Sequence, residues 1–437
     1  MINQIKKVGV IGAGTMGAGI AGQVANAGID VWLLDLPSDG EDVNMLSGKG
    51  LERLKDPDMP GLMSKEAENL INLGNTRDHF HELADCDWIA EAVVERLDIK
   101  QSLYKKLNDS CKKSTIITSN TSTIPIKLLT EGMPIEFCER FAITHFFNPV
   151  RFMRLLELVR GEFTRDDVIS TLHEFSEIKL GKGVVPCSDT PGFLANRVGV
   201  FAIQCALHNA FELGLSPTEA DAFFGRPLGL PKTGVFGLYD LIGIDLMADV
   251  VKSLVSILPE DDAFHKYSAP IDFMTKMIAN GQTGNKNDKG FYKQDGDGKK
   301  VINLSNGDYV PHERLKAPLL EIAEKNGVSE ILNDNGPYGL YIWRVLSETL
   351  CYAASLVPEV TEDLTQIDDA MKLGYNWIKG PFELLDEIGA EGFINRLKDD
   401  GRDVPSFLQK SLPKKFYTAL ESELSFLGVD GATKPIV

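Results

Sequence analysis

The sequence predicts an α/β fold, a doubly wound parallel sheet, followed by an all-α region made of two related helical repeats. Three observations support this prediction. Short apolar strands alternate with helices from residue 7 to about residue 187, the remainder follows a helical pattern, and two stretches of that remainder repeat each other. At 437 residues the chain is too long for one hydrophobic core, so at least two domains are expected.

Composition and charge exclude several classes of function. The net charge of −18 argues against a general binder of nucleic acid or of an anionic membrane. The six cysteines are scattered and form no C-x-x-C pair, so neither a metal site nor a disulfide framework is expected. No apolar run approaches the roughly 20 residues that a membrane span needs, and the chain does not open with a signal-peptide pattern. A reducing, cytoplasmic compartment is therefore expected.

A glycine-rich loop follows the first predicted strand, residues 7–11, and opens a helix that runs to about Asn26. Gly12 allows a tight turn, Gly14 lets the backbone approach a pyrophosphate, and Gly17 lets the helix pack on the strand. The free N–H groups at the start of the helix would then face the phosphates. The predicted cofactor-binding residues of this loop are Gly12, Gly14, Thr15, Met16 and Gly17.

The second predicted strand, residues 30–35, ends in Asp35, about 20 residues beyond the loop. A glycine loop between a strand and a helix, with an acid at this distance, predicts a Rossmann-type dinucleotide site. Asp35 would accept hydrogen bonds from the adenosine ribose and would repel a 2′-phosphate, which favours NAD over NADP. The loop alone also fits flavin adenine dinucleotide, or a tight turn that binds nothing.

Residues 38–80 are polar and are expected to form a helical insertion, with helices at 44–54 and 64–73. Between these helices, Asp-Pro-Asp-Met-Pro-Gly predicts a turn. Several basic residues supply local positive charge to an acidic chain: Lys49, Arg53, Lys55 and Lys65. For any single one of them, a solvated helix surface is the better interpretation.

Two further predicted strands, 86–95 and 115–119, bring polar residues to one edge of the sheet. Ligands of an open α/β sheet bind at the carboxyl ends of its strands. Glu95, Asn120 and Ser122 all fall at such ends. For the Asn-Thr-Ser stretch, a helix cap or an ordinary turn is the alternative.

Two apolar strands are predicted at 141–147 and 154–160, joined by an Asn-Pro turn. His145 lies near the end of the first strand, and Glu157 stands among leucines in the second. A buried carboxylate is costly unless it is paired, and an imidazole held by a carboxylate is the usual form of a general base. From these residues alone, a catalytic pair and a purely structural ion pair fit equally well.

Pro191 and Gly192 break the chain where the pattern changes to helical, and the domain boundary is predicted near 188–191. In that part Phe236-Gly-Leu-Tyr-Asp-Leu-Ile-Gly243 is echoed by Phe382-Glu-Leu-Leu-Asp-Glu-Ile-Gly389. The first copy has Asn196 on its leading helix, where the second has Trp343, so only the first offers a polar group to a site. The predicted domains are 1–189, a first helical repeat at 190–295, a linker at 296–336 and a second, degenerate repeat at 337–437.

Together these motifs resemble the 3-hydroxyacyl-CoA dehydrogenase family. They run in the family's order and cover most of the chain. The tandem repeats are similar to those of long-form members, which often continue into an enoyl-CoA hydratase/isomerase domain; no hydratase-like stretch is present here. The segments that carry the resemblance are Gly12–Gly17 with Asp35, Glu91–Lys100, Ser119–Ser122, His145–Val150 with Met153 and Glu157, and Asp189–Arg197.

The resemblance implies oxidation of (3S)-3-hydroxyacyl-CoA to 3-ketoacyl-CoA with NAD, a step of fatty acid β-oxidation. It implies that His145 is the catalytic base and Glu157 its partner. Ser122 and Asn196 match polar residues near the substrate oxygen. The residues that match positions around the nicotinamide and its ribose are Glu95, Lys100 and Asn120.

The same resemblance implies several partners: an acyl-CoA substrate, a hydratase joined covalently or non-covalently, and, within the chain, a second repeat that packs on the first as a subunit would. Two other functions stay open. One is another NAD-dependent dehydrogenase of the β-hydroxyacid type, which would use a lysine base from the helical domain. The other is a binding protein that has lost its activity, although both members of the His145–Glu157 pair are present.

Overall fold

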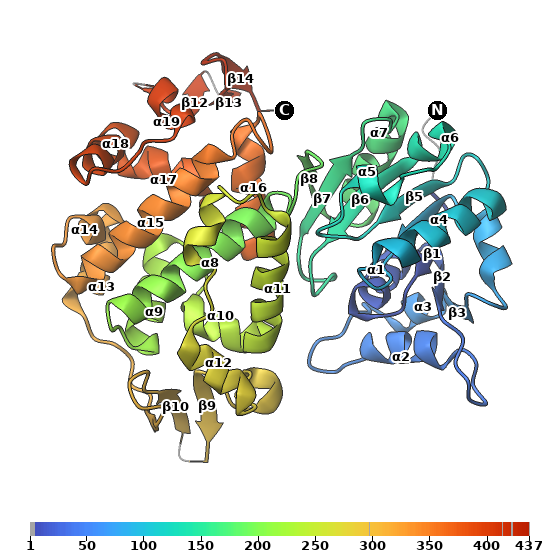
Figure 1. Cartoon of the computed structure of the whole chain (residues 1–437), viewed down its shortest axis with the longest axis horizontal. Helices are drawn as coiled ribbons and strands as arrows, with labels where there is room; N and C mark the ends of the chain where they lie inside the picture. The colour runs from blue at the N-terminus through green and yellow to red at the C-terminus, as the bar shows by residue number, and fades with distance from the viewer. Residues whose placement is uncertain (1–4, 297, 413, 421–422, 437) are drawn as a thin grey trace. The chain divides into compact units, whose positions relative to one another are not determined.

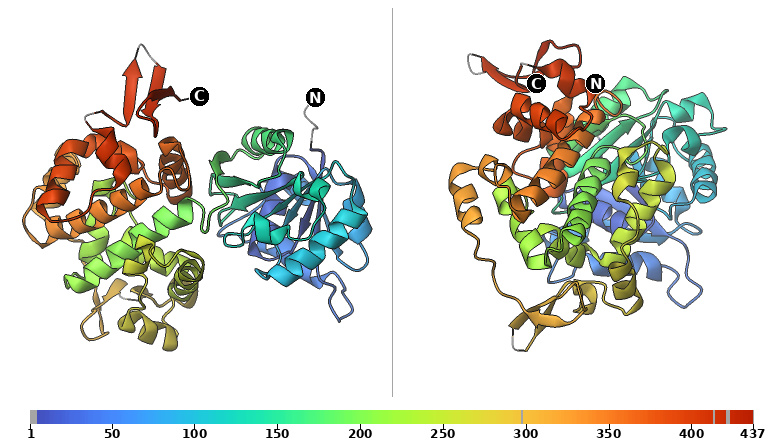
Figure 2. Two further views of the ribbon diagram at one scale, coloured as in Figure 1. Left: turned by 45° about the horizontal axis from the view of Figure 1, so that its top comes forward. Right: turned by 60° about the vertical axis from the view of Figure 1, so that its left-hand side comes forward.

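A computed structural model describes residues 5–296, 298–412, 414–420 and 423–436 of the chain. The chain divides into two compact units, Met1–Phe193 and Leu194–Val437. The first is built around one sheet and the second is mainly helical (Figures 1 and 2). Each unit has its own hydrophobic core.

The first unit contains an eight-stranded sheet in the order β3-β2-β1-β4-β5-β6-β7-β8. Strand β7 runs antiparallel to β6, β8 runs parallel to β7, and the other neighbouring strands pair in parallel. The order reverses between β1 and β4, which is where open α/β sheets bind ligands. The strands are β1 Lys7–Ile11, β2 Asp30–Asp35, β3 Ile71–Asn75, β4 Trp88–Glu91, β5 Ile116–Ser119, β6 Phe141–Phe146, β7 Leu155–Arg160 and β8 Gly183–Cys187.

Helices cover both faces of this sheet because successive side chains of a strand point to opposite faces. On one face, Val8 and Val10 of β1 pack into a core shared with α1 and α7. On the other face, Tyr104 of α4 packs against Phe137 and Phe141, with ring centroids 5.9 and 5.1 Å away. The helices of this unit are α1 Thr15–Asn26, α2 Met45–Arg53, α3 Lys65–Glu68, α4 Leu97–Ser110, α5 Ile126–Leu129, α6 Ile135–Cys138 and α7 Asp166–Glu174.

The insertion at 38–80 differs from its prediction. The helix predicted at 44–54 is present as α2, but the one predicted at 64–73 ends after one turn as α3, and β3 follows it. Strand β3 pairs in parallel with β2 along its whole length. Pairing with a strand that lies some 40 residues earlier in the chain outweighs the helical tendency of the polar segment, because it satisfies the backbone at the edge of the sheet.

The second unit is mainly helical, with two small antiparallel sheets that were not predicted. Its helices are α8 Ala195–Glu212, α9 Pro217–Phe223, α10 Gly234–Ile242, α11 Ile244–Ile257, α12 Asp272–Ala279, α13 Pro318–Asn326, α14 Ser329–Leu332, α15 Pro337–Ser355, α16 Leu364–Tyr375, α17 Pro381–Ile388, α18 Ala390–Asp399 and α19 Ser406–Ser411. Its strands are β9 Tyr292–Asp295, β10 Gly298–Ile302, β11 Tyr309–Pro311, β12 Tyr417–Leu420, β13 Glu423–Leu427 and β14 Thr433–Pro435.

The segment 296–336, predicted as a linker, therefore contains β10, β11, α13 and α14. The strands β9, β10 and β11 are short, with three to five residues each, which makes them hard to recognise in the sequence. Val301 and Ile302 are buried, which ties β10 to the core of the unit.

Matching aspartates anchor the two repeats in the same way. Asp240 of α10 accepts hydrogen bonds from the backbone N–H groups of residues 291–292 at 2.8 and 2.7 Å. Asp386 of α17 accepts them from residues 416–417 at 2.9 and 2.8 Å. In each repeat a helix thus holds the start of a strand through one carboxylate.

A second pair of buried aspartates, one in each repeat, also accepts hydrogen bonds from backbone N–H groups. Asp221 accepts hydrogen bonds from the backbone of residues 236–237, and Asp368 from residues 382–383. The hydroxyls of Tyr292 and Tyr417 donate to these carboxylates at 2.8 and 2.9 Å. Burial raises the pKa of Asp221 and of Asp368 to about 7. Duplicated contacts at this level indicate that both repeats share one fold.

The two repeats pack on each other through α8 and α15. Arg197 of α8 donates to Glu359 at 2.7 Å and to the Tyr352 hydroxyl at 3.2 Å. Gly199 faces the ring of Tyr375 so closely that a Cβ atom would lie 2.1 Å from it. A side chain at position 199 would therefore displace this ring, which belongs to α16.

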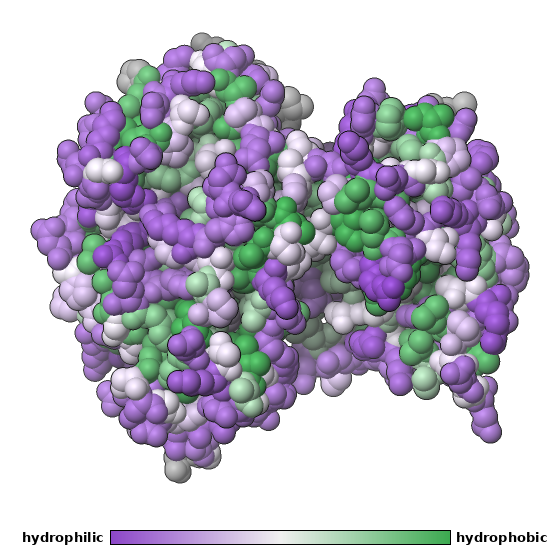
Figure 3. Space-filling model, viewed as in Figure 1, coloured by the Kyte–Doolittle hydropathy of each residue, from purple (hydrophilic) through white to green (hydrophobic). Residues whose placement is uncertain are grey.

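Hydrophilic residues cover most of the face seen in Figure 3, with hydrophobic residues in small separate groups. No helix within the described ranges is long and apolar enough to cross a membrane.

Candidate active site

The glycine loop has the geometry of a phosphate cradle. Gly12 has a φ of +99°, and a Cβ atom on it would lie 2.4 Å from the carbonyl oxygen of Ala92. A Cβ atom on Gly17 would lie 1.7 Å from the oxygen of Gly12, so helix α1 starts directly against the turn. Gly14, in contrast, faces open space within 4 Å and caps α1 with no side-chain hydrogen bond. The N–H groups of α1 therefore remain accessible to a phosphate, which fits a dinucleotide.

Thr15 and Met16 form the first turn of α1; Thr15 is exposed and Met16 half-buried. Asp35, at the end of β2, lies beside the glycine loop. Its carboxylate accepts hydrogen bonds from the backbone of Ala13 at 2.6 Å and of Leu36 at 2.7 Å. This is the side of the loop at which an adenosine ribose would be bound.

The end of β4 carries a fully buried carboxylate, Glu91. It accepts hydrogen bonds from Lys100 at 2.6 Å, the Tyr104 hydroxyl at 2.5 Å, Ser119 at 2.7 Å and the backbone of Val93 at 2.8 Å. A carboxylate with four donors, one of them cationic, is fully compensated for its loss of water. This network fixes the ends of β4 and β5 to α4.

Glu95 lies at the outer side of the same network. Its carboxylate is 3.2 Å from the ammonium of Lys100 and accepts hydrogen bonds from the hydroxyls of Thr121 and Thr123. Burial acts to raise the pKa of Glu95, but the Lys100 charge and these hydrogen bonds outweigh it and lower the pKa. Lys100 itself is 1% exposed and lies between the carboxylates of Glu91 and Glu95. Its predicted contact with the cofactor stays a prediction.

Asn120 joins two strand ends beside the predicted base. Its backbone N–H donates to Glu91 at 2.8 Å, and its side-chain oxygen accepts from the backbone of Phe146 at 2.9 Å. Ser122, two residues later, is half-buried. Within the part of the chain that the structure describes, its hydroxyl makes no hydrogen bond with His145. Its predicted role toward the substrate stays a prediction.

His145 and Glu157 stand directly opposite each other in the β6–β7 pair. The Nδ1 atom of His145 lies 2.7 Å from an oxygen of Glu157, whose side chain is 0% exposed. The imidazole is packed by the rings of Phe147 and Phe193, with centroids 4.6 and 5.7 Å away. In the neutral ring, Nδ1–H donates to the carboxylate, which leaves the lone pair on Nε2. The pair can therefore accept a proton at Nε2 and stabilise the resulting cation.

Asn196 belongs to the second unit, where it is half-buried in the first turn of α8. Trp343, at the matching place in the second repeat, is buried and donates from Nε1 to Asp400 at 2.6 Å. The second repeat thus uses this position for packing. The contact of Asn196 with a substrate stays a prediction.

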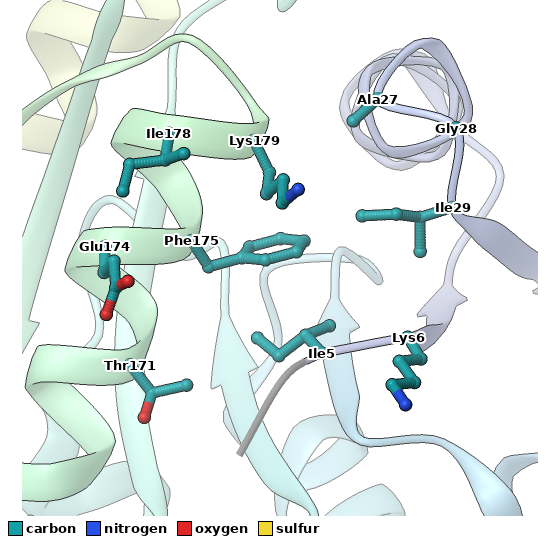
Figure 4. Close-up of a pocket in the computed structure, with 10 residues that line it drawn as sticks. All are labelled: Ile5, Lys6, Ala27, Gly28, Ile29, Thr171, Glu174, Phe175, Ile178 and Lys179. Atoms are coloured by element: carbon teal, nitrogen blue, oxygen red, sulfur yellow. The ribbon is translucent and has the colours of Figure 1, made fainter. Parts of the chain in front are cut away.

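A pocket of about 380 Å³ lies at the opposite end of the sheet (Figure 4). Ile5 and Lys6 precede β1 and Ile29 precedes β2, so the pocket is at the amino ends of these strands. The Phe175 ring points into it from the helical turn after α7. Ligands of open sheets bind at the carboxyl ends, so this pocket is not the candidate active site. No group of three metal-ligating side chains is found among the described residues.

From the sequence, no individual role was predicted for several residues that shape the site, although some of them lie in segments that carry the family resemblance. Tyr104 lies four residues after Lys100 on α4. This i, i+4 spacing places both side chains on one face of the helix, and it could have indicated that they share a partner. The threonines beside Glu95 and the phenylalanines against His145 gave no local signal, since their partners are distant in the chain. The overlooked residues are Tyr104, Ser119, Thr121, Thr123, Phe147 and Phe193.

Comparison with known proteins adds independent support. Over 97% of its length, the chain is 40% identical to a protein of Rickettsia prowazekii (strain Madrid E) named as a fatty acid oxidation complex trifunctional enzyme. It is 41% identical over 297 residues to a probable 3-hydroxyacyl-CoA dehydrogenase of Deinococcus radiodurans, a match that covers 68% of the chain and 85% of that relative. The chain spans 58% of the length of the Rickettsia relative, just over half.

Among solved structures, 3-hydroxybutyryl-CoA dehydrogenase from Escherichia coli has a similar fold. The TM-score is 0.69 at 24% sequence identity, over 93% of this chain and 98% of that one. This likeness confirms the predicted fold class, in which a Rossmann-type sheet is followed by a helical region.

Family models locate the same two parts along the sequence. The NAD-binding domain of 3-hydroxyacyl-CoA dehydrogenase matches residues 7–190, and the C-terminal domain of that enzyme matches residues 192–294 and 339–420. These matches cover most of the chain and confirm NAD as the cofactor and oxidoreductase as the class of enzyme. The chain belongs to the 3-hydroxyacyl-CoA dehydrogenase family.

Proposed function

We propose that this chain oxidises the 3-hydroxyl group of a (3S)-3-hydroxyacyl-CoA to a ketone, as a step of fatty acid β-oxidation. The observation that carries the proposal is the buried His145–Glu157 pair on the neighbouring strands β6 and β7. Nδ1 of His145 lies 2.7 Å from a carboxylate oxygen of Glu157. When bound, NAD supplies the acceptor for the hydride that leaves C3. Every other element of the step comes from the chain's own residues.

His145 removes the proton of the 3-hydroxyl group at Nε2, because Nδ1 is engaged with Glu157. Glu157 holds this tautomer and stabilises the imidazolium that forms. In the reverse direction, the imidazolium returns the proton to the ketone oxygen. Phe147 and Phe193 pack against the imidazole and keep water from part of its surface.

The remaining predicted residues have supporting roles in this proposal. Ser122 and Asn196 donate hydrogen bonds to the substrate oxygen. Glu95 and Asn120 orient the nicotinamide end of the cofactor, and Lys100 acts by fixing Glu95. Gly12, Gly14 and Gly17, with Thr15 and Met16, cradle the pyrophosphate, and Asp35 binds the ribose; the open space at Gly14 supports this arrangement.

The larger assembly is also a matter of proposal, because the chain spans 58% of the Rickettsia relative. We place it in the cytoplasm, with a hydratase as its partner, attached to the chain or separate. The predicted boundaries are kept: 1–189 for the NAD-binding domain and 190–295 and 337–437 for the repeats. Contact between α8 and α15 supports a second repeat that serves the first as an internal partner.

The test follows the absorbance of NADH at 340 nm with acetoacetyl-CoA as the oxidant. Oxidation of NADH is expected, and it should require His145. If no 3-ketoacyl-CoA of any chain length supports oxidation, the chain is a binding protein and the proposal is wrong. Turnover of short β-hydroxyacids without CoA would favour a dehydrogenase of the β-hydroxyacid type.

A further inference from the structure

Lys182, the residue before β8, is a lysine buried in the first unit. It is 5% exposed, and its Nζ donates hydrogen bonds to the carbonyl oxygens of Val150 and Met153, the latter at 2.8 Å. The ring centroid of Phe146 lies 5.8 Å from the same nitrogen. No carboxylate among the described residues lies within salt-bridge distance, and burial lowers the pKa of Lys182 to about 8. A buried ammonium without a counter-ion is costly, so its presence calls for a compensating role.

Both of these carbonyls belong to the loop 147–154, which joins β6 to β7. The last paired residues before the loop are Phe146 and Leu156, and the next pair is His145 with Glu157. The predicted base and its partner are thus only the second pair from the loop. If the loop loosened, only the Phe146–Leu156 pair would separate it from His145 and Glu157.

The same loop contacts other parts of the NAD-binding domain. A Cβ atom on Gly19 of α1 would lie 2.7 Å from a methyl group of Val150, so the loop is packed tightly on α1. Arg151 donates to the carbonyl oxygen of Pro60 in the insertion at 2.6 Å. Hydrogen bonds from Lys182 thus connect the loop to the start of β8. Other residues of the loop contact α1 and the insertion.

We propose that Lys182 is a positioning residue for proton transfer: by bonding the carbonyls of Val150 and Met153, it holds the loop that keeps His145 against Glu157. This inference rests on the proposed function of the pair. Lys182 does not touch the reacting atoms; its effect reaches them through the loop. The ammonium is well suited to this task because it has three donors and can serve two carbonyls at once.

Lys182→Met tests the proposal, since methionine fills similar space without donors. Turnover should fall at least tenfold, with KM for acetoacetyl-CoA and Kd for NADH within threefold of wild type and a Tm equal to or above that of wild type. Lys182→Gln, which keeps an amide donor, should give an intermediate kcat. The matched control is Lys179→Met, which removes an exposed charge three residues earlier and should leave every value unchanged.

Equal kcat in wild type and both Lys182 variants would overturn the proposal, as would a loss of kcat accompanied by a fall in Tm. A second readout does not need turnover. The Nδ1–H proton of His145, identified by its absence in His145→Gln, should be a downfield resonance in the wild-type NMR spectrum. It should broaden in Lys182→Met and persist in Lys179→Met. If wild type lacks activity, the proposed function fails, while this resonance still decides whether Lys182 orders the pair.

Discussion

Glu157→Gln is the sharpest test of the His145–Glu157 pair, because it keeps the shape of the side chain and removes only its charge. The carboxylate is 0% exposed and lies 2.7 Å from Nδ1 of the imidazole. When His145 takes the substrate proton, the wild-type pair becomes an imidazolium beside a carboxylate. The variant instead forms an imidazolium beside a neutral amide, which lacks the compensating charge.

The loss can be estimated from the geometry. Two unit charges whose centres are about 4 Å apart attract each other by about 4 kcal/mol at an effective dielectric constant of about 20. Because about 1.4 kcal/mol corresponds to a factor of ten in rate, full loss of this attraction would slow turnover by about 10³. Proton transfer is only partly complete in the transition state, so kcat should fall by about 10² to 10³. The glutamine N–H₂ group can also donate to Nδ1, which would leave Nε2 protonated and unable to act as base.

The assay is NADH oxidation by acetoacetyl-CoA at 340 nm, run across a pH series on both proteins. The pH–rate profile of Glu157→Gln should differ from that of wild type, because the imidazolium that forms in the reaction has lost its counter-charge. Glu162→Gln, an exposed neighbour beyond β7, controls for the change in net charge. A folded Glu157→Gln variant with kcat within threefold of wild type and the same pH–rate profile would refute the catalytic interpretation and leave a structural ion pair.

Three further predictions address the base, the cofactor and the repeats. His145→Gln should lower kcat by about 10² to 10⁴ while NADH fluorescence still reports binding, and retained turnover would remove His145 as the base. Asp35→Asn keeps an acceptor for Ala13 but loses the charge, so the ratio of kcat/KM for NADPH to that for NADH should rise about tenfold; an unchanged ratio would contradict the role of Asp35. Asp221 holds its proton to about pH 7 in the folded chain and to about pH 3.8 when unfolded, so unfolding free energy should fall as pH rises from 4 to 7. Asp221→Asn should flatten the decline of Tm between pH 5 and 7.5, and equal slopes in both proteins would argue against it.

The sequence predicted the cofactor loop and the His–Glu hairpin because both depend on local chemistry. Glycines at fixed offsets specify a turn that other residues cannot adopt, and Gly12 indeed has a φ of +99°. An Asn-Pro turn between two apolar runs specifies a hairpin, and the hairpin places His145 opposite Glu157. In both cases the partners lie within a few tens of residues of each other.

Features that depend on partners far away in the sequence were harder to predict. Strand β3 is a strand because β2 lies beside it, and nothing in Ile-Asn-Leu-Gly-Asn by itself outweighs the polar setting. The role of Lys182 was not predicted either. Its partners are backbone carbonyls about 30 residues away, and every residue type has a backbone carbonyl, so the sequence does not reveal them.

Comparison of matched positions in the two helical repeats distinguishes residues that the fold requires from residues that the proposed chemistry requires. Both repeats keep the aspartate that anchors a strand, Asp240 in one and Asp386 in the other, with matching bonds to backbone N–H groups. At one matched position of the leading helices they differ: Asn196 is polar, whereas Trp343 is buried and bonded within its own repeat. If Asn196 served packing alone, a polar group would have no advantage over the tryptophan that packs the same position in the second copy. The difference is consistent with the proposed role of Asn196 toward a ligand in the first repeat.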